Sequence, residues 1–274
     1  MTFTLPEPED DGLIKNEVKP HAQDKHHALQ RYMYAFTTAM YRKWYTYYVD
    51  LFCGSGVDDI QGVGLDWGSP LLAAQMPKRF SRLMLNDLDS EKIQALEQRI
   101  ARYKQPQEAM VINEDANKAV DQIVNAIPSK SLTLAFIDPY GLDLAFSSIE
   151  KLSTRKTDLV IFFPDHVSMI RNWKAYFLGQ EQSKLDAFLG TKEWRGRILE
   201  SNTDSHIDIF RSIYEEQLGK LGYEFTSPHR IKSQNNRPIY RLMFASREKL
   251  GREIWERVLL KDRGGQSSFD FSGG

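Results

Sequence analysis

Residues 47–56 constrain the fold of this chain more than any other segment. The apolar and aromatic residues before Asp50 are typical of a buried parallel strand, and Gly54 and Gly56 follow in a Gly-x-Gly turn. Glycines in such a turn let the backbone bend sharply and approach a ligand where a Cβ would collide. We therefore expect an α/β protein with a nucleotide-type cofactor at the end of this strand.

The turn matches neither common phosphate-binding motif. A dinucleotide-binding motif has a third glycine where this chain has Asp59, and a P-loop needs a Gly-Lys-Ser/Thr sequence, which is absent. An acid before a glycine turn suits a cofactor with a cationic amino-acid end, and S-adenosylmethionine fits that description. The cofactor-binding residues expected in this segment are Asp50, Phe52, Gly54, Ser55 and Gly56.

Two later strands are also followed by acids. Residues 82–87 are expected to form a short strand that ends at Asp87, and residues 110–112 form a third strand shortly before Asp115. A carboxylate at the tip of the neighbouring strand can accept both ribose hydroxyls, so Asp87 is predicted to bind ribose. Asp115 is predicted to accept a hydrogen bond from the adenine amine. The alternative for each acid is a helix N-cap.

A continuous apolar run at residues 132–137 predicts a central parallel strand, which is followed by Asp138, Pro139, Tyr140 and a glycine. Because proline donates no hydrogen bond, Asp138 and nearby carbonyls stay free to accept from a substrate amino group, while Tyr140 can stack on a planar base. We predict that Asp138, Pro139 and Tyr140 are catalytic residues for methyl transfer to an exocyclic amine. The alternative is an ordinary turn after a strand.

These four segments together resemble the motifs of class I S-adenosylmethionine-dependent methyltransferases. Asp138-Pro139-Tyr140 is similar to the Asp-Pro-Pro-Tyr motif of amino-methyltransferases, with one proline missing, and also to the corresponding motif of certain transfer-RNA guanine methyltransferases. The resemblance implies a Rossmann-like, seven-stranded, mostly parallel sheet that ends in an antiparallel hairpin and carries helices on both faces.

A narrower resemblance, over roughly residues 20–270, is to the three-Cys-motif partner protein (TcmP) family. It is carried by Lys25-His26, by residues 49–56, by Gly68-Ser69-Pro70 and by residues 137–141. The resemblance implies a Cys-motif partner protein and a substrate-binding role for Lys25 and His26.

Composition narrows the class of protein. The 274 residues are 41% hydrophobic and 27% charged, which is typical of a globular chain, and 36 basic against 37 acidic residues give a net charge of −1. That balance argues against a protein that coats nucleic acid by bulk charge, although a local basic face stays possible. No apolar run reaches the ~20 residues of a membrane helix and no secretory signal is present, so we expect a cytoplasmic protein without a membrane partner.

The single cysteine, Cys53, excludes an internal disulfide and any Cys-cluster metal site, and no metal is expected. It also excludes a cytosine-5 methyltransferase, which needs a nucleophilic cysteine later in the chain.

The domain organisation expected is a flexible acidic arm at residues 1–23 and a single methyltransferase-like domain at 24–274, with a helical insertion at about 164–205. Residues 57–67 are expected to form a long loop that acts as a lid. His166, in the insertion, is a possible base, but a cap or surface role is the favoured interpretation.

Two strands, at 223–227 and 239–245, are expected to form the closing hairpin, joined by a polar and basic loop. Arg230, Lys232 and Arg237 of this loop are predicted to bind substrate. Further basic residues up to Arg263, interleaved with Tyr240, Phe244 and Trp255, form a candidate nucleic-acid surface. The alternative is a solvated helix face with a core stripe.

The leading hypothesis is therefore an S-adenosylmethionine-dependent methyltransferase that acts on an amino group of a nucleobase in DNA or RNA. One alternative is a non-catalytic, cofactor-binding accessory protein that works with a Cys-motif partner. Another is a small-molecule methyltransferase, which the near-zero net charge leaves open.

Overall fold

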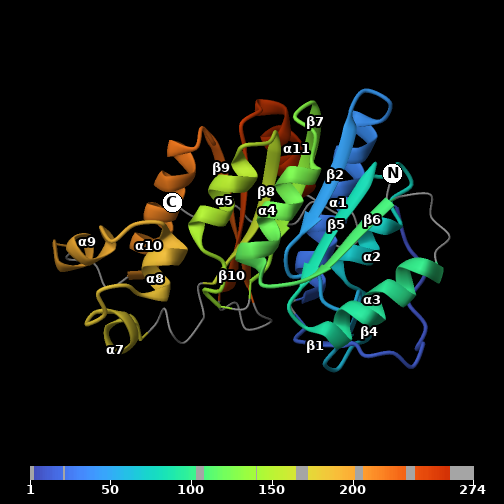
Figure 1. Cartoon of the computed structure of the whole chain (residues 1–274), viewed down its shortest axis with the longest axis horizontal. Coiled ribbons are helices and arrows are strands. Elements are labelled where there is room, and N and C mark those ends of the chain that lie inside the picture. The colour runs from blue at the N-terminus through green and yellow to red at the C-terminus, as the bar shows by residue number, and fades with distance from the viewer. Residues whose placement is uncertain are drawn as a thin grey trace.

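The structure is a computed structural model that describes residues 3–20, 22–102, 108–139, 141–164, 172–200, 206–232 and 238–259. Its central element is a seven-stranded sheet (Figure 1). In spatial order the strands are β6 (Glu108–Asn113), β5 (Arg82–Asp87), β2 (Tyr45–Asp50), β7 (Ser131–Ile137), β8 (Thr157–Phe163), β10 (Pro238–Ser246) and β9 (Phe225–Lys232). The first five are parallel, and β10 runs antiparallel to both of its neighbours. The predicted fold class is confirmed by this strand order.

Helices cover both faces of the sheet because successive strand residues point to opposite sides. One hydrophobic cluster contains Tyr48, and it packs against α1 (Ala22–Met40), α2 (Ser69–Ala74), α3 (Ser90–Arg102) and α11 (Lys249–Leu259). The other contains Tyr47 and Val49. It packs against α4 (Ala116–Ala126), α5 (Phe146–Ser153), α7 (Trp173–Phe177), α8 (Lys184–Leu189), α9 (Trp194–Glu200) and α10 (His206–Lys220).

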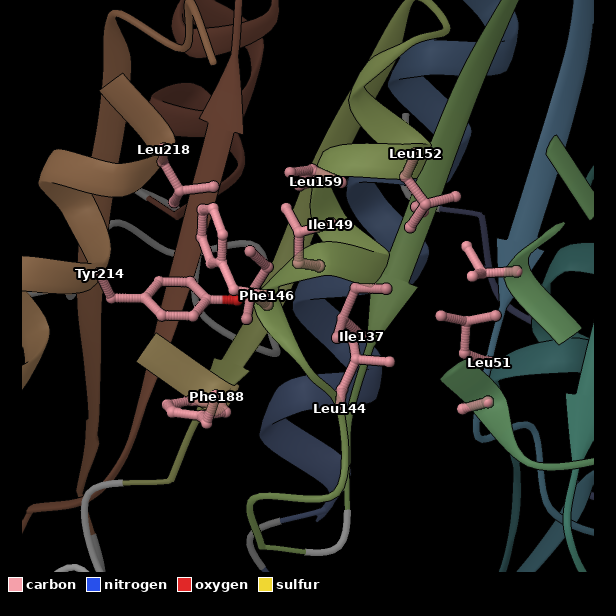
Figure 2. Packing of buried hydrophobic residues seen from close by; sticks show 14 of the residues in the cluster. Leu51, Ile137, Leu144, Phe146, Ile149, Leu152, Leu159, Phe188, Tyr214 and Leu218 are labelled. Atoms are coloured by element: carbon pink, nitrogen blue, oxygen red, sulfur yellow. The ribbon is translucent and has the colours of Figure 1, made fainter. Parts of the chain in front are cut away.

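Figure 2 shows part of the second cluster, in which Phe146 of α5 lies between the sheet and Tyr214 of α10. The two rings meet edge to face with their centroids 5.3 Å apart. Such aromatic contacts attach the α8–α10 layer, which is far along the chain, to the parallel part of the sheet. The helices α7, α8 and α9 lie where the sequence predicts a helical insertion.

Residues 57–67 form a hairpin, which corrects the expectation of a long lid loop. The strands β3 (Val57–Ile60) and β4 (Gly64–Trp67) pair antiparallel, and β1 (Asn16–Val18) adds to β3 in parallel, giving a second sheet. The reason is burial, because Val57, Ile60 and Trp67 are each at most 8% exposed.

The described part of the N-terminal segment contacts the domain, which the expected loose arm at 1–23 does not anticipate. Phe3 stacks on Tyr34 with ring centroids 6.1 Å apart, and the indole N–H of Trp67 donates to the carbonyl of Pro6 at 2.6 Å. Aromatic and polar contacts thus connect this segment to α1 and to the small sheet.

The closing hairpin is longer than predicted. β9 continues to Lys232, so the backbones of Arg230 and Lys232 lie in a strand and pair with β10, whereas a loop was expected. Arg237 lies outside the described residues.

Among the described residues, no helix combines the length and hydropathy needed to cross a bilayer.

Candidate functional site

A cavity of about 1140 Å³ opens at the carboxyl ends of β2, β5, β6 and β7. This is the edge at which ligands bind in open parallel sheets, and β2 is the strand on whose two sides the chain order runs in opposite directions. The predicted site residues that line the cavity are Lys25, His26, Phe52, Gly54, Asp87, Asp115, Asp138 and Pro139. Asp50, Ser55 and Gly56 do not line it. Tyr140 and His166 lie outside the described residues.

The glycine turn needs both of its glycines. Gly54 has φ +59° and Gly56 has φ +85°, in the left-handed region that other residues adopt at a cost. A Cβ on Gly54 would lie 2.6 Å from the side-chain atoms of Asn16, and one on Gly56 would lie 2.8 Å from a methyl of Leu96. The first glycine therefore permits the approach of β1, and the second permits the packing of α3.

Asp50 supports this turn from inside the protein. Its carboxylate is fully buried and accepts hydrogen bonds from the Ser69 hydroxyl at 2.6 Å, the Tyr48 hydroxyl at 3.1 Å and the Phe52 N–H at 3.2 Å. Burial raises the pKa of Asp50 to about 7, although these donors oppose the shift. Asp50 thus accepts from three protein donors and fixes the chain between β2 and α2.

Asp87 lies at the end of β5 and also contacts the glycine turn. It accepts from the Gly54 N–H at 2.8 Å and from the Asp89 N–H at 3.0 Å. The cap of α3 is Asp89, whose side chain accepts from the N–H of Glu91 at 3.0 Å, so Asp87 is not that cap. A carboxylate has about four acceptor positions, and Asp87 therefore keeps acceptor capacity on the cavity wall.

Asp115 is the N-cap of α4, as the alternative interpretation of this acid proposed. Its side chain accepts from the Asn117 N–H at 2.9 Å. Because it also lines the cavity, capping leaves its second carboxylate oxygen available to a ligand.

Lys25 and Asp138 form an ion pair in the wall of the cavity, although 113 positions separate them in the sequence. The Lys25 ammonium also lies over the Phe162 ring, 4.9 Å from its centroid. Burial disfavours the charge on Lys25, but Asp138, with smaller contributions from Asp58 and Asp50, outweighs it and raises the pKa of Lys25. Lys25 is therefore a cation that is held against the predicted catalytic carboxylate.

His26 lies beside this pair but is neutral. It is 4% exposed, and its Nδ1 is 3.6 Å from Asp58 and makes no hydrogen bond to any described residue. Burial, together with the charge of Lys25, lowers the pKa of His26 to about 3. Asp58 instead accepts from the Asn16 amide at 2.7 Å, and the Asn16 amide oxygen accepts from the Ser55 N–H at 3.1 Å. β1 is thereby attached to the glycine turn.

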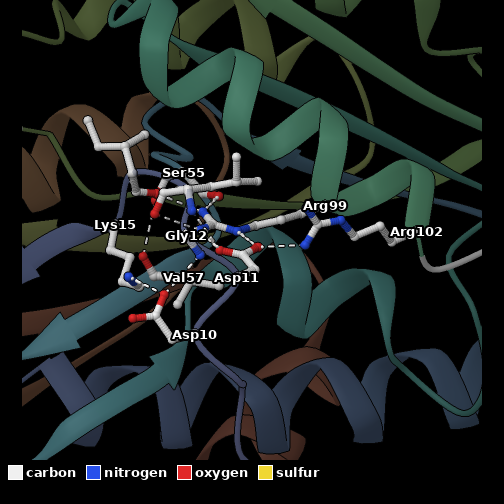
Figure 3. Close-up of polar contacts among 10 residues, drawn as sticks. Asp10, Asp11, Gly12, Lys15, Ser55, Val57, Arg99 and Arg102 are labelled. Carbon is white, nitrogen blue, oxygen red and sulfur yellow. Dashed lines mark hydrogen bonds and ion pairs between the residues drawn. The ribbon is translucent and has the colours of Figure 1, made fainter.

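Arg99 makes the second attachment between the N-terminal segment and the turn (Figure 3). This side chain of α3 is 2% exposed and donates to both oxygens of Asp11, at 2.9 and 2.8 Å. It also donates to the carbonyls of Ser55 at 2.7 Å and Ile14 at 2.9 Å. The hydrogen bonds from Arg99 lower the pKa of Asp11 to about 2.

Sequence reasoning missed Asn16, Asp58 and Arg99. Only Arg99 carried a signal in the sequence. It comes three residues after Leu96 on the apolar face of α3, and a charge on that face needs a buried partner. Asn16 and Asp58 carried no comparable signal, because polar residues near turns are common.

Several residues of the predicted C-terminal nucleic-acid surface are buried or ion-paired in the structure. Phe244 and Trp255 are both 0% exposed and belong to the core, so they are not available to stack on bases. Arg241 is 7% exposed and pairs with Asp208 at 2.7 Å. On α11, Lys249 and Arg252 pair with glutamates one turn later, as the alternative of a solvated helix face with a core stripe requires.

Comparisons with known proteins give similarities of fold. No protein-family model and no curated protein matches the sequence. Among solved structures, a Legionella pneumophila protein is 12% identical, with a TM-score of 0.49, over 81% of this chain and 83% of that chain. The O-methyltransferase from Bacillus cereus in complex with SAH is 10% identical, with a TM-score of 0.49, over 86% and 84%.

A third similar structure is Trm1 from Pyrococcus horikoshii, solved with S-adenosyl-L-methionine. It is 10% identical to this chain, with a TM-score of 0.45. The similar region covers 93% of this chain and 62% of Trm1. The strand order described above shows the fold, and the positions of the cavity-lining residues define the candidate site.

Proposed function

We propose that the protein is an S-adenosylmethionine-dependent methyltransferase that acts on an amino group of a nucleobase in DNA or RNA. The observation that carries the proposal is the convergence of the glycine turn after β2 with Asp87, Asp115 and Asp138 around one cavity. Their positions at the ends of parallel strands correspond to the ligand-binding edge of such sheets.

The residues present fit the proposed cofactor. Gly54, Asp87 and Asp115 line one cavity, and the two carboxylates offer acceptors for hydroxyl and amino groups. S-adenosylmethionine supplies an activated methyl group on a cationic sulfur when it is bound. In this proposal Asp87 accepts from ribose hydroxyls and Asp115 from the adenine amine, while Asp50 keeps the turn in place from behind.

Asp138 is proposed to hold the acceptor amine. Lys25 pairs with the Oδ2 atom of Asp138, so the Oδ1 atom is the one left to accept an N–H from the acceptor. A carboxylate in that position orients the nitrogen lone pair and stabilises the positive charge that develops on nitrogen. Lys25 fixes the orientation of Asp138, and Tyr140 is proposed, from the sequence alone, to stack on the base.

We further propose membership of the three-Cys-motif partner family, with a Cys-motif protein as a partner. The support is that Lys25, His26, Gly68, Ser69 and Asp138, which carry the resemblance, all line one cavity. We also propose that the protein is cytoplasmic, as expected from the sequence.

The cofactor is tested by calorimetric titration with S-adenosylhomocysteine. Asp87→Asn should weaken binding about ten- to a hundred-fold, since a lost charged hydrogen-bond acceptor is worth roughly 1.5–3 kcal/mol. The matched control is Asp121→Asn, which removes an exposed acid of α4 that pairs only with Lys151 among the described residues. No binding by the parent protein would overturn the proposal, and equal binding by Asp87→Asn would remove Asp87 from the site.

Methyl transfer is tested with labelled cofactor and separate pools of RNA, DNA and small molecules. Asp138→Asn should reduce transfer about a hundred-fold while cofactor binding changes little. Asparagine is preferred to alanine because it fills the same space beside Lys25. The double variant Lys25→Gln/Asp138→Asn removes both charges of the pair and shows whether an unpaired buried cation causes any loss of folding. Label in the small-molecule pool alone would replace the nucleobase with a small acceptor.

A further inference from the structure

The amino ends of the central strands form an edge on the side of the sheet away from the cavity. β5, β2, β7 and β8 begin next to one another, as the partners Tyr47 with Arg82, Tyr45 with Ser131 and Thr133 with Thr157 show. The turns that lead into these strands are residues 41–44, 75–81, 127–130 and 154–156, so they meet at this edge. We call their surface the amino-edge patch.

The amino-edge patch is basic and its charges are not neutralised. Its seven cations are Arg155, which donates to the carbonyl of Ile127 at 2.8 Å, and a group of six: Arg42, Lys43, Lys78, Arg79, Lys130 and Lys156. Within the group of six, Lys78 is half-buried and the other five are exposed. None of the six pairs with an acidic side chain in the part of the chain that the structure describes, in contrast to Lys249 and Arg252 of α11. In a chain with a net charge of −1, this is a local concentration of positive charge.

Three large aromatic side chains are exposed among these cations. Tyr41 is 43% exposed, Trp44 is 40% exposed and Tyr45 is 72% exposed. The Lys78 ammonium lies 4.3 Å from the centroid of the Tyr41 ring, and that of Lys156 lies 5.0 Å from the Trp44 ring. Three exposed aromatic rings in one short segment, among cations that have no acidic partner among the described residues, point to a ligand that is both planar and anionic.

Arg42 adds a backbone argument. It has φ +60°, and it is the one residue other than glycine with a positive φ among those that the structure describes. The turn between α1 and β2 therefore holds an arginine where glycine or asparagine is the unstrained choice. Strain at an exposed cation is compatible with selection for the charge and its position.

We propose that the amino-edge patch binds single-stranded nucleic acid. The cations contact phosphates, and Tyr45 and Trp44 offer faces on which unpaired bases stack. A single strand is favoured over a duplex because stacking on a side chain needs a base that is free of its partner. An acidic protein segment would use the charges but would leave the aromatic faces without a matching group. Binding here needs neither the cofactor nor Asp138, so it stands apart from the proposed methyl transfer.

The charges are tested with a fluorescein-labelled 12-nucleotide oligouridylate, by anisotropy at several salt concentrations and without cofactor. Lys78→Glu/Lys156→Glu should weaken binding at least tenfold at low salt. It should also flatten the slope of log K against log salt by about 1.4, the value for two lost phosphate contacts on a single strand. The control Lys192→Glu/Lys220→Glu makes the same change in net charge at exposed lysines of the helical layer, and should bind within twofold of the parent.

The aromatic contact has its own readout in Trp44. The four other tryptophans are at most 8% exposed, so a ligand that stacks at the patch should quench the emission of Trp44 selectively. Quenching by oligouridylate should disappear in Trp44→Leu, and affinity should fall about tenfold.

Three results would overturn the proposal. They are no oligouridylate binding at low salt, equal loss of binding in the control double variant, and tighter binding of a duplex of the same length. Binding of a polyglutamate peptide without any binding of oligouridylate would assign the patch to an acidic protein. None of these outcomes bears on methyl transfer, which is measured separately.

Discussion

The replacement Asp11→Asn tests whether the N-terminal segment is part of the cofactor site. Asp11 pairs through both oxygens with Arg99, and the same guanidinium donates to the carbonyl of Ser55 in the glycine turn. Asparagine keeps the size of the side chain but removes its charge, so Arg99 is left as a buried cation with only neutral acceptors.

The size of the effect follows from the pKa of Asp11. A shift from 3.8 to about 2 corresponds to roughly 2.4 kcal/mol of preference for the charged form in the folded protein. Asp11 is 16% exposed, and solvent screening reduces this to about 1–2 kcal/mol. For a chain of this length we expect the melting temperature to fall by about 2–8 °C.

The pH dependence of the effect gives a sharper test. Because the pKa of Asp11 is lowered on folding, its contribution is fully present above pH 3.8 and is lost as the pH falls toward about 2. The difference in unfolding free energy between the parent and Asp11→Asn should therefore be constant from pH 7 to 5 and should shrink below pH 4. Binding of S-adenosylhomocysteine at pH 7 should weaken as well, because the Ser55 end of the turn loses its rigid support.

The control for this prediction is the neighbouring residue. Asp10 is 66% exposed and pairs with Lys15 at 2.7 Å, so Asp10→Asn should leave both the melting temperature and cofactor binding unchanged. If Asp11→Asn melts with the parent, or if Asp10→Asn has an equal effect, the argument that Arg99 joins the N-terminal segment to the turn is wrong.

Two further predictions concern the turn itself. Gly54→Ala should cost about 1–2 kcal/mol from its positive φ alone, and its Cβ would displace Asn16, so cofactor affinity by calorimetry should fall at least tenfold; unchanged affinity would mean that β1 gives way without consequence. Ser69→Ala should destabilise the protein more at pH 8 than at pH 5. The pKa of Asp50 is raised to about 7, so Asp50 lowers stability as the pH rises from about 4 through 7, and losing the Ser69 donor leaves the ionised carboxylate less well solvated. Equal urea midpoint shifts at the two pH values would contradict the assigned pKa.

The sequence pattern was sufficient to locate the inner parallel strands of the central sheet. The inner parallel strands are short, largely buried runs of apolar and β-branched residues, and this local pattern was readable at 47–50, 82–87 and 132–137. The position of acids at strand ends also follows from the sequence, because the carboxyl ends of parallel strands share one edge of the sheet. The sequence therefore predicts that Asp87, Asp115 and Asp138 lie around one site, and all three line the cavity.

The sequence pattern was insufficient where a segment's structure depends on a distant partner. Residues 57–67 carry glycines and acids that are typical of a loop, and they form a hairpin because β1 pairs with one strand of it and the buried Trp67 anchors the other. The acidic N-terminal segment resembled a flexible arm because its composition does not reveal that Asp11 meets a buried arginine 88 positions later.

Tertiary structure also decided the chemistry of individual groups. Lys25 is held against Asp138, His26 is neutral and the pKa of Asp50 is raised. All three properties result from burial and from neighbouring charges, which depend on how α1 packs on the sheet. The amino-edge patch is a similar case, since its cations come from four separate turns that only the strand order brings together. Hydrophobic periodicity is a local property and so specifies elements, whereas ion pairs and surfaces join residues far apart in the chain and exist only once those elements are packed.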